Sequence, residues 1–288
     1  MVAKGVDKGF TIIEVTLFLA VTGLLFAMLL AGAGTAVRRE RYNDSVSNLQ
    51  EILQAQYSKV ANTQSDSSRT TCTEGGTGTT NPYIRPGLTP ADPGRTLNCD
   101  IYGRLIIFDN PSNNDTGNIY AYNVIGLDSK DAGIDIQGKT LVQALTALKL
   151  SRDTDSQEIS NLTWSAHVQP PKSINNGKFA GDNDPNNPNA VLIVRSPLSD
   201  SIVTFIGAVT VSDPTSPNWW GLTSVLNATP PNMVTGRSMS LCVESSSRTF
   251  ASMRAIYIAP FGSGPSAVSI APLDVSDSTT DVPKVNCG

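Results

Sequence analysis

The chain has 288 residues, a formal net charge of -4 and a pI near 5.0, so its composition excludes a general binder of nucleic acids or other polyanions. Hydrophobic residues make up 40% of the chain, which excludes disorder by composition alone. Charged residues are only 16%, and Ser, Thr, Asn and Gly are abundant. This balance favours strands and loops on an extracytoplasmic surface over a helical cytosolic enzyme.

A long apolar segment follows the first few residues. Phe10 to Ala36 predicts a helix of about 40 Å at ~1.5 Å per residue, long enough to cross a bilayer. No charged residue lies between Val15 and Val37. The segment exceeds the apolar region of an ordinary secretory signal, about 7–15 residues. The only processing-like sequence, Lys8-Gly9, precedes it, so cleavage there would leave the apolar helix on the mature chain.

The stretch KGFTIIEVTLFLAVTGLL, Lys8 to Leu25, resembles the N-terminal signature of type IV pilins and of the pseudopilins of type II secretion. The resemblance implies that a prepilin peptidase cuts between Gly9 and Phe10 and that the new N-terminus, Phe10, is N-methylated. It also implies that Glu14 sets the register between subunits by pairing with the Phe10 amine of a neighbour. The resemblance covers about Lys8 to Tyr57.

One position departs from the pattern of major pilins. Those proteins usually carry a proline where this chain has Ala31, and here Gly32 and Gly34 could loosen the helix instead. Gly23 matches a glycine that is common in the family. Pseudopilins and many minor pilins also lack the proline, so the type of filament stays open.

The charges flanking the apolar segment weakly favour an orientation opposite to that of pilins. The leader carries Lys4 and Lys8, whereas Arg38, Arg39 and Arg41 follow the segment. The positive-inside rule would place the arginines in the cytoplasm. The resemblance implies the reverse, a cytoplasmic leader with the rest of the chain outside, and the paired cysteines agree with that orientation.

Beyond the membrane the helical pattern continues with an amphipathic stripe, so one helix is expected from Thr11 to about Asn62. The stripe residues are Tyr42, Val46, Leu49, Leu53, Tyr57 and Val60. A β-sheet packed on this stripe predicts an α+β fold, a long N-terminal helix against an antiparallel β-sheet head. The expected organisation is a leader at 1–9, a transmembrane and polymerisation helix at 10–37, the amphipathic second half of the helix at 38–63 and an extracytoplasmic β-rich head at 64–288.

Short runs rich in Val, Ile, Tyr and Phe supply the strands of the expected sheet. They are Arg104–Asp109, Ile119–Leu127, Leu162–Val168, Ala190–Arg195, Ile202–Val211, Met239–Glu244 and Met253–Ala259. Lys139–Leu150 predicts a short helix. Ser65–Asn98 is expected to be a connection rich in Thr, Gly and Pro.

The four cysteines favour disulfides over a metal site. They lie too far apart for zinc, which prefers ligand pairs two to four residues apart. An even number fits two disulfides in an oxidising compartment. We expect Cys72–Cys99 and Cys242–Cys287, because each closes a local loop; the alternative is four buried thiols.

Two kinds of loop suggest ligands but are better explained as turns. GIDIQGKT, from Gly133 to Thr140, matches a phosphate-binding loop, but Asp135 would repel phosphate, and a loop leading into a short helix explains it better. Asp182–Asn189 and Asp109–Asn118 are rich in the oxygen ligands that calcium prefers, yet the first lacks the glycine and the glutamate of a calcium loop. Polar turns explain both.

Few aromatic or basic side chains stand out as candidates for chemistry. His167 is the only histidine, so a metal site built from several histidines is excluded. It lies in an expected strand and is best explained as a side chain with an ordinary hydrogen bond. Trp219 and Trp220 lie in a Pro-rich loop, either as a plug on the core or as an exposed ligand platform.

The function expected from these features is structural and not enzymatic, with no cofactor and no metal. The chain is expected to be a minor pilin of a type IV pilus-like filament, first a single-pass inner-membrane precursor among membrane lipids and then part of a cell-surface filament. Its expected partners are other pilin subunits, the prepilin peptidase and the inner-membrane assembly platform. The alternatives are a type II secretion pseudopilin and a tip adhesin or DNA-uptake pilin, for which DNA or surface binding has no direct support.

Overall fold

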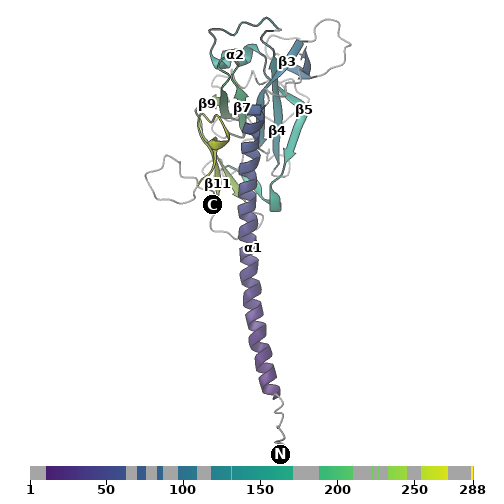
Figure 1. The fold of residues 1–288 in the computed structure, drawn as a ribbon, viewed down its shortest axis with the longest axis vertical. Coiled ribbons are helices and arrows are strands. Elements are labelled where there is room, and N and C mark those ends of the chain that lie inside the picture. The colour runs from purple at the N-terminus through teal and green to yellow at the C-terminus, as the bar shows by residue number, and fades with distance from the viewer. Residues whose placement is uncertain are drawn as a thin grey trace, which may run out of the picture. The chain divides into compact units, whose positions relative to one another are not determined.

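The structure is a computed structural model that describes residues 11–62, 70–75, 83–86, 97–108, 118–130, 132–170, 188–209, 222, 226, 233–244, 254–271 and 287 (Figure 1). For β1, β2 and the first three residues of β3 it describes the backbone alone. The chain divides into two compact units, 1–44 and 45–288. The elements are α1 (Ile12–Asn62), β1 (Thr70–Gly75), β2 (Tyr83–Pro86), β3 (Leu97–Phe108), β4 (Ile119–Leu127), α2 (Leu141–Ala147), β5 (Ser151–Ser160), η1 (Thr163–Ser165), β6 (His167–Gln169), β7 (Ala190–Arg195), β8 (Ile202–Gly207), β9 (Met233–Thr235), β10 (Met239–Glu244), β11 (Ala255–Ile258), η3 (Pro265–Ala267) and β12 (Val268–Ala271).

The expected long helix is present as α1, which has 51 residues. Its first part is rich in Leu and Ala, which are strong helix formers. The helix continues without a break through Ala31, Gly32 and Gly34, so the two glycines do not interrupt it. The first unit holds α1 up to Asp44, and the second unit holds its last turns, from Ser45, together with the strands that the structure describes.

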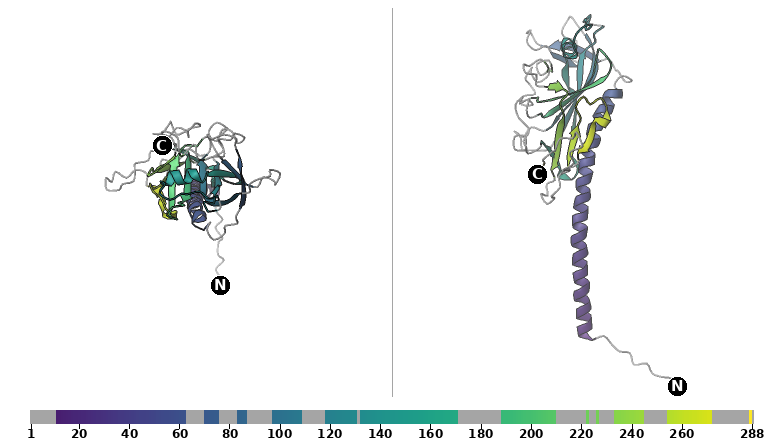
Figure 2. Two further views of the ribbon diagram at one scale, coloured as in Figure 1. Left: turned by 90° about the horizontal axis from the view of Figure 1, so that it is seen from above. Right: turned by 90° about the vertical axis from the view of Figure 1, so that its left-hand side faces the viewer.

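A large antiparallel sheet, sheet A, forms the centre of the second unit. Its eight strands include the run β2-β1-β3-β7-β8-β9, and β4 joins β3 to β5. The long strand β3 makes this branching possible. One edge of β3 pairs with β4 along nearly its whole length, while its other edge pairs first with β1 and then with β7. The second sheet, sheet B, has the order β12-β11-β10-β6 and is also antiparallel. Figure 2 shows the strands from two further directions.

A bulge in β3 accompanies the change of partner from β1 to β7. Tyr102 is the extra residue, because the pairing with β4 jumps from Ile101 to Gly103. A side chain on Gly103 would place its Cβ only 2.0 Å from the carbonyl oxygen of Ile193 on β7. The close approach of the two backbones therefore requires glycine at this position.

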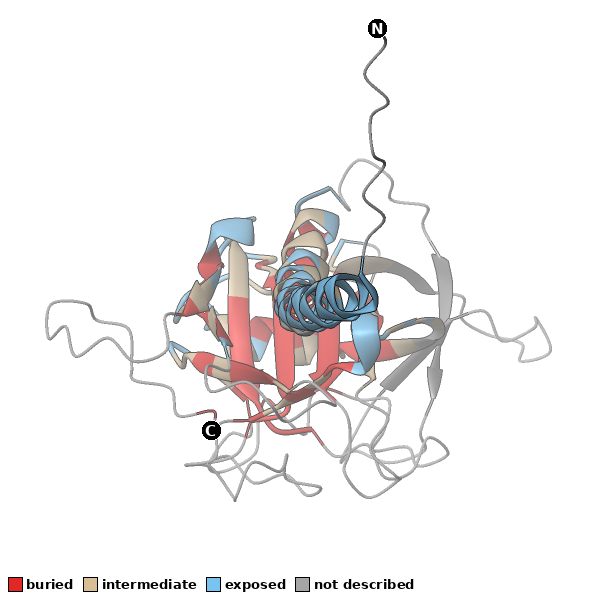
Figure 3. Cartoon of the chain, turned by 90° about the horizontal axis from the view of Figure 1, so that it is seen from below, coloured by how far each residue is buried: buried red, intermediate tan, exposed pale blue. Residues whose placement is uncertain are grey.

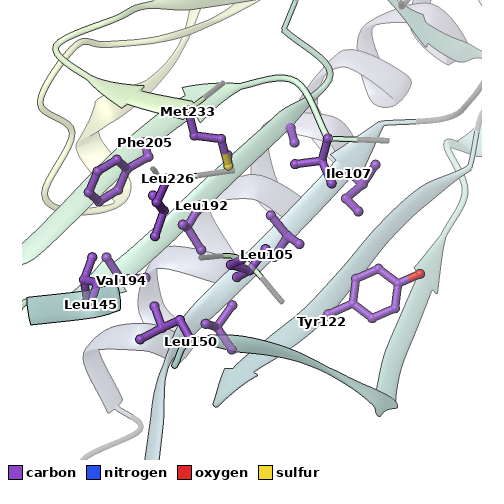
Figure 4. Close-up of a cluster of buried hydrophobic side chains, with 14 of the residues drawn as sticks. Leu105, Ile107, Tyr122, Leu145, Leu150, Leu192, Val194, Phe205, Leu226 and Met233 are labelled. Atoms are coloured by element: carbon purple, nitrogen blue, oxygen red, sulfur yellow. The ribbon is translucent and has the colours of Figure 1, made fainter. Parts of the chain in front are cut away.

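Both faces of sheet A are covered. Leu105, Leu192 and Phe205 lie opposite one another across three strands and belong to a core with Leu145 of α2 (Figure 4). Their neighbours Arg104, Ile193 and Thr204 are also paired across the strands, and they face the last turns of α1, to which Arg104 and Thr204 are hydrogen-bonded. Because both faces are buried, β3 and β7 have continuous apolar runs.

The structure confirms the α+β class and the antiparallel sheet, and it corrects several of the expected strands. Three expected strands, β4, β7 and β10, have the predicted bounds. The expected strand Leu162–Val168 begins instead as the 3-10 turn η1, and only His167–Gln169 is a strand. Two strands, β1 and β2, lie within the expected connection 65–98, and β5 was not predicted because it is polar.

Candidate functional site

The first turn of α1 is closed by Thr11 and Glu14. Glu14 Oε2 accepts hydrogen bonds from the backbone nitrogen and the hydroxyl of Thr11, both at 2.9 Å, and the Glu14 backbone nitrogen donates to the Thr11 hydroxyl at 3.4 Å. This reciprocal arrangement is a capping box, which satisfies backbone donors that have no partner within the helix. Oε1 of the same carboxylate accepts no hydrogen bond from the described residues. The carboxylate therefore keeps one oxygen available for another donor.

Sequence reasoning singled out Glu14 for its charge and missed this second role. The signal was present, because Thr11-Ile12-Ile13-Glu14 has the T-x-x-E spacing of a capping box directly before an apolar run. Gly9 and Phe10, the predicted cleavage and methylation positions, lie outside the described residues.

The helix after Glu14 is coloured as exposed in Figure 3, and its exposed side chains are mostly apolar. Phe18 is 68% exposed and Leu30 is 72% exposed. Within the described part of the chain, α1 is the one helix long and apolar enough to cross a membrane. An exposed apolar surface of this extent marks a membrane or protein contact.

Two threonines within this apolar segment, Thr16 and Thr22, are hydrogen-bonded to the backbone of the helix itself. The Thr16 hydroxyl donates to the Ile13 carbonyl at 3.0 Å, and the Thr22 hydroxyl donates to the Phe18 carbonyl at 2.8 Å. Hydrocarbon offers no hydrogen bonds, so polar groups in a membrane must find partners within the protein. These threonines meet that requirement without any neighbouring chain.

The last turns of α1 bury the predicted apolar stripe in the second unit. Val46, Leu49, Leu53, Tyr57 and Val60 are all buried there. The Tyr57 hydroxyl lies 2.9 Å from the Thr204 hydroxyl, and burial raises the pKa of Tyr57 although this hydrogen bond opposes the shift. The stripe predicted from helical spacing is confirmed for these five residues.

A buried arginine links α1 to the centre of sheet A. Arg104 of β3 is 4% exposed, and its Nε donates to Gln56 Oε1 at 2.9 Å. Its other nitrogens donate to Asn123 Oδ1 at 2.5 Å and lie 2.8 Å from Glu158 Oε2. Glu158 also pairs with Lys59 of α1 at 2.6 Å. Burial raises the pKa of Glu158, but the hydrogen bond from Lys59 and the charge of Arg104 outweigh it, so the net shift is downward.

Further polar contacts hold the sides and the end of the same helix segment. The amide nitrogens of Gln50 and Gln54 donate to the Val268 carbonyl of β12 at 3.3 and 3.2 Å. Arg195 of β7 donates to the Ala61 carbonyl at 2.8 Å. A cation at the last carbonyls of a helix is favoured by the helix dipole. The last turns of α1 are therefore fixed within the second unit by apolar packing and by hydrogen bonds.

One of the two predicted disulfides is present among the described residues. Cys242 of β10 and Cys287 are bonded, with Cα atoms 5.6 Å apart. The backbones of Cys72 and Cys99 lie in neighbouring strands, where Cys72 is opposite Leu97 and Cys99 is opposite Thr70. Their side chains lie outside the described residues, so that disulfide remains a prediction.

The other candidate motifs are ordinary structural features where the structure describes them. Thr140 caps α2 in a capping box with Gln143, as expected for a loop leading into a short helix. His167 Nε2 lies 3.1 Å from Glu244 Oε2 on the paired strand β10. The two candidate calcium loops lie almost wholly outside the described residues, as do Trp219 and Trp220. Within the described part of the chain no group of His, Cys, Asp and Glu side chains could hold a metal ion.

Two aromatic residues of the second unit, Trp164 and Phe261, are exposed with a positive φ, and neither was anticipated. Phe261 is 71% exposed and has a positive φ of 57°, which is rare for a bulky residue. A Cβ on Gly236 would meet its ring at 2.6 Å, so the ring covers this glycine. The next residue, Gly262, accepts a hydrogen bond from Thr204 at 2.5 Å. The position of Phe261 is thus tied to the residues that hold Tyr57.

No protein-family model matches this chain, and neither does any curated protein or solved structure.

Proposed function

We propose that the chain is a structural subunit, a minor pilin, of a type IV pilus-like filament. It starts as a single-pass membrane precursor and assembles through its N-terminal helix after a prepilin peptidase removes residues 1–9. The observation that carries the proposal is α1 itself. One helix begins with a capping box that contains Glu14, continues with exposed apolar side chains and ends with a stripe buried under a sheet. The resemblance of Lys8–Leu25 to the pilin signature supports a role for this helix in filament assembly.

The exposed apolar half needs a non-aqueous environment at each stage. Side chains such as Phe18 and Leu30 each contribute about 1.5–3 kcal/mol when they leave water. Lipid supplies that environment for the precursor, and the same helices of neighbouring subunits supply it in a filament. Because Thr16 and Thr22 are already hydrogen-bonded to their own helix, these two hydroxyls stay satisfied when the helix moves between these environments.

Glu14 then sets the position of each subunit along the filament. In the single chain Oε2 caps the helix and Oε1 is left for a cation. In a filament the Phe10 amine of a neighbouring subunit provides that cation. Other axial positions would bury the carboxylate without a partner, which costs several kcal/mol. The capping box uses only Oε2, so Oε1 can pair with the neighbouring amine while the hydrogen bonds of the cap remain.

A set of substitutions at Thr11 and Glu14 separates the charge from the cap. Glu14→Gln keeps an acceptor for the cap and removes the charge, whereas Thr11→Val removes the cap and keeps the charge. The proposal predicts that Glu14→Gln inserts and is cleaved normally but enters filaments poorly, and that Thr11→Val enters them with a smaller loss. The measurement is the ratio of filament-associated to membrane-retained protein in cells, with Thr11→Ser as the matched control. Normal assembly of Glu14→Gln would show that the glutamate is a cap and not a register device.

Processing is tested separately. Gly9→Val places a β-branched side chain before the cut, so the leader should remain and the precursor should stay in the membrane. Mass spectrometry of the wild type should find an N-terminus at Phe10 carrying one methyl group. A wild-type chain that keeps residues 1–9 in the presence of the peptidase would contradict the pilin assignment.

A ligand-binding role for the head is the second candidate, and Phe261 favours it. An exposed aromatic side chain on a positive-φ backbone is a costly arrangement, and such strain is concentrated at functional positions. Phe261→Ser should leave filament incorporation unchanged and reduce adhesion of the filament to its target surface. Unchanged adhesion would remove this candidate.

A further inference from the structure

The end of the apolar segment carries charges that separate onto two sides of α1. Arg38, Arg39, Glu40, Arg41 and Asp44 are all exposed. At about 100° per residue, the three arginines lie on one side of the helix and the two acidic residues on the opposite side. Among the described residues, Arg38 and Arg39 form no ion pair. Within two turns, α1 therefore has a basic side and an opposite acidic side.

The arginines lie where a membrane surface would be. Arg38 follows Glu14 by 24 residues, which an α-helix covers in about 36 Å. The hydrocarbon core of a bilayer is about 30 Å thick, and about 40–45 Å with the headgroups. Side chains of a helix lean toward its N-terminus, so Arg38 and Arg39 lean back toward the apolar segment. Their long stems allow the guanidinium groups to reach the headgroup layer.

Arginine in this place fits one chemical class particularly well. The planar guanidinium donates paired hydrogen bonds to phosphate and is favoured over lysine where phosphate is recognised. We propose that Arg38 and Arg39 bind the phosphate groups of anionic phospholipids at the membrane surface where the apolar segment ends. These contacts fix the depth of the segment in the bilayer. They also compensate for arginines on the side of the membrane that the positive-inside rule disfavours.

A nucleic acid fits the same residues less well. Neutralising a nucleic acid takes several cations along a line of phosphates. Here the next charges on the helix are Glu40, Arg41 and Asp44, so acidic residues interrupt the basic ones, and the whole chain carries a net charge of -4. A phospholipid such as phosphatidylglycerol has a single phosphate, which one or two arginines can bind. That phosphate lies at the membrane surface, where the end of the apolar segment places Arg38 and Arg39. The inference rests on the membrane-spanning part of the proposed function and not on filament assembly.

The experiment uses the full-length chain in nanodiscs of phosphatidylcholine with and without phosphatidylglycerol. Native mass spectrometry counts the lipids that stay bound after the disc is removed. The wild type should retain phosphatidylglycerol over phosphatidylcholine. Arg38→Gln and Arg39→Gln should each lower that preference about fivefold, which corresponds to ~1 kcal/mol for one charge near an anionic surface.

Matched controls come from the acidic side of the same turns. Glu40→Gln and Asp44→Asn change the charge by one unit in the opposite direction and should leave the preference intact or raise it. An equal preference in the double arginine variant, or none in the wild type, would overturn the proposal. The proposal would also be overturned if the chain in phosphatidylcholine discs bound a DNA duplex through these arginines and retained no phosphatidylglycerol in preference to phosphatidylcholine. Failure of the wild type to float with vesicles would overturn the membrane span itself and this inference with it.

Discussion

Replacing Arg104 should destabilise the head strongly, because this side chain is the polar link between α1 and sheet A. Arg104→Met keeps most of the apolar volume and removes every donor. Gln56, itself buried, and Asn123 then lose their partner at 2.9 and 2.5 Å. An unsatisfied buried polar group costs about 1–3 kcal/mol, and the half-buried Asn123 should cost less than Gln56, so the expected loss in the free energy of unfolding is about 2–4 kcal/mol.

The acidic partner should matter much less. The Glu158 side chain is 43% exposed, so water screens its pairs with Arg104 and Lys59. Such a partly exposed pair contributes about 1 kcal/mol or less. Glu158→Gln keeps an acceptor for Arg104 and should therefore cost no more than that. The prediction is therefore that Arg104→Met costs much more stability than Glu158→Gln.

The pH dependence follows from the direction of the Glu158 shift. Its pKa is lowered in the folded chain, so its contribution is complete above the ordinary glutamate pKa of about 4.3 and is lost as the pH falls through the lower folded value. Stability in Glu158→Gln should therefore match the wild type more closely at about pH 3 than at about pH 7.

The assay is urea denaturation of the full-length chain in detergent, followed by tryptophan fluorescence, because all three tryptophans lie outside the apolar segment. The double variant Arg104→Met, Gln56→Leu removes one orphaned partner and should recover part of the loss. A stability of Arg104→Met equal to the wild type would refute the reasoning. So would a loss in Glu158→Gln as large as that in Arg104→Met.

Three further substitutions test packing and covalent links in the same assay. Gly103→Ala brings a Cβ against the main chain of β7 and should cost about 1–3 kcal/mol, whereas Gly264→Ala, with open space around it, should be neutral; equal effects would contradict the close approach. Leu53→Ala empties a fully buried site under the sheet and should cost about 2–5 kcal/mol; a smaller loss would mean that the stripe is not packed as described. Cys242→Ser removes a link between residues 45 apart and should cost about 4 kcal/mol in the chain-entropy model. Unreduced peptide mapping of the wild type should recover Cys242 joined to Cys287, and free thiols there would contradict the structure.

Strands could be predicted where burial on both faces leaves a continuous apolar run. β7, with the sequence Ala-Val-Leu-Ile-Val-Arg, is bounded by Asn189 and Ser196 and was found with its ends in place. The strand β5, with the sequence Ser-Arg-Asp-Thr-Asp-Ser-Gln-Glu-Ile-Ser, has no such run because it pairs only with β4 and lies at an edge of the sheet. Polar residues protect an edge strand from pairing with other chains. The same residues leave no apolar pattern from which the strand could be predicted.

The polar links of the candidate site divide in the same way. The capping box of Thr11 and Glu14 is local, and its spacing is readable from the sequence. The partners of Arg104 are not, because Gln56 and Asn123 come from elements separated from it by 48 and 19 residues. A basic residue beside an apolar run gives no sign of whether it ends in solvent or in a buried network. Only the pairing of β3 with β4 and the packing of α1 decide that.

The two parts of α1 satisfy their polar side chains by opposite means, and this difference matches the two environments that the proposed function assigns to them. Between Thr11 and Thr22, the described hydroxyls and the Glu14 carboxylate bond within their own helix. Hydrocarbon requires this, because it supplies no partner. From Gln50 onward, the glutamines and Tyr57 bond to strands far away in the sequence. A self-satisfied helix can leave lipid for a bundle of its own kind without losing hydrogen bonds, whereas the second part cannot leave its sheet. Assembly and head stability should therefore respond to separate sets of substitutions, Glu14 for the first and Arg104 for the second.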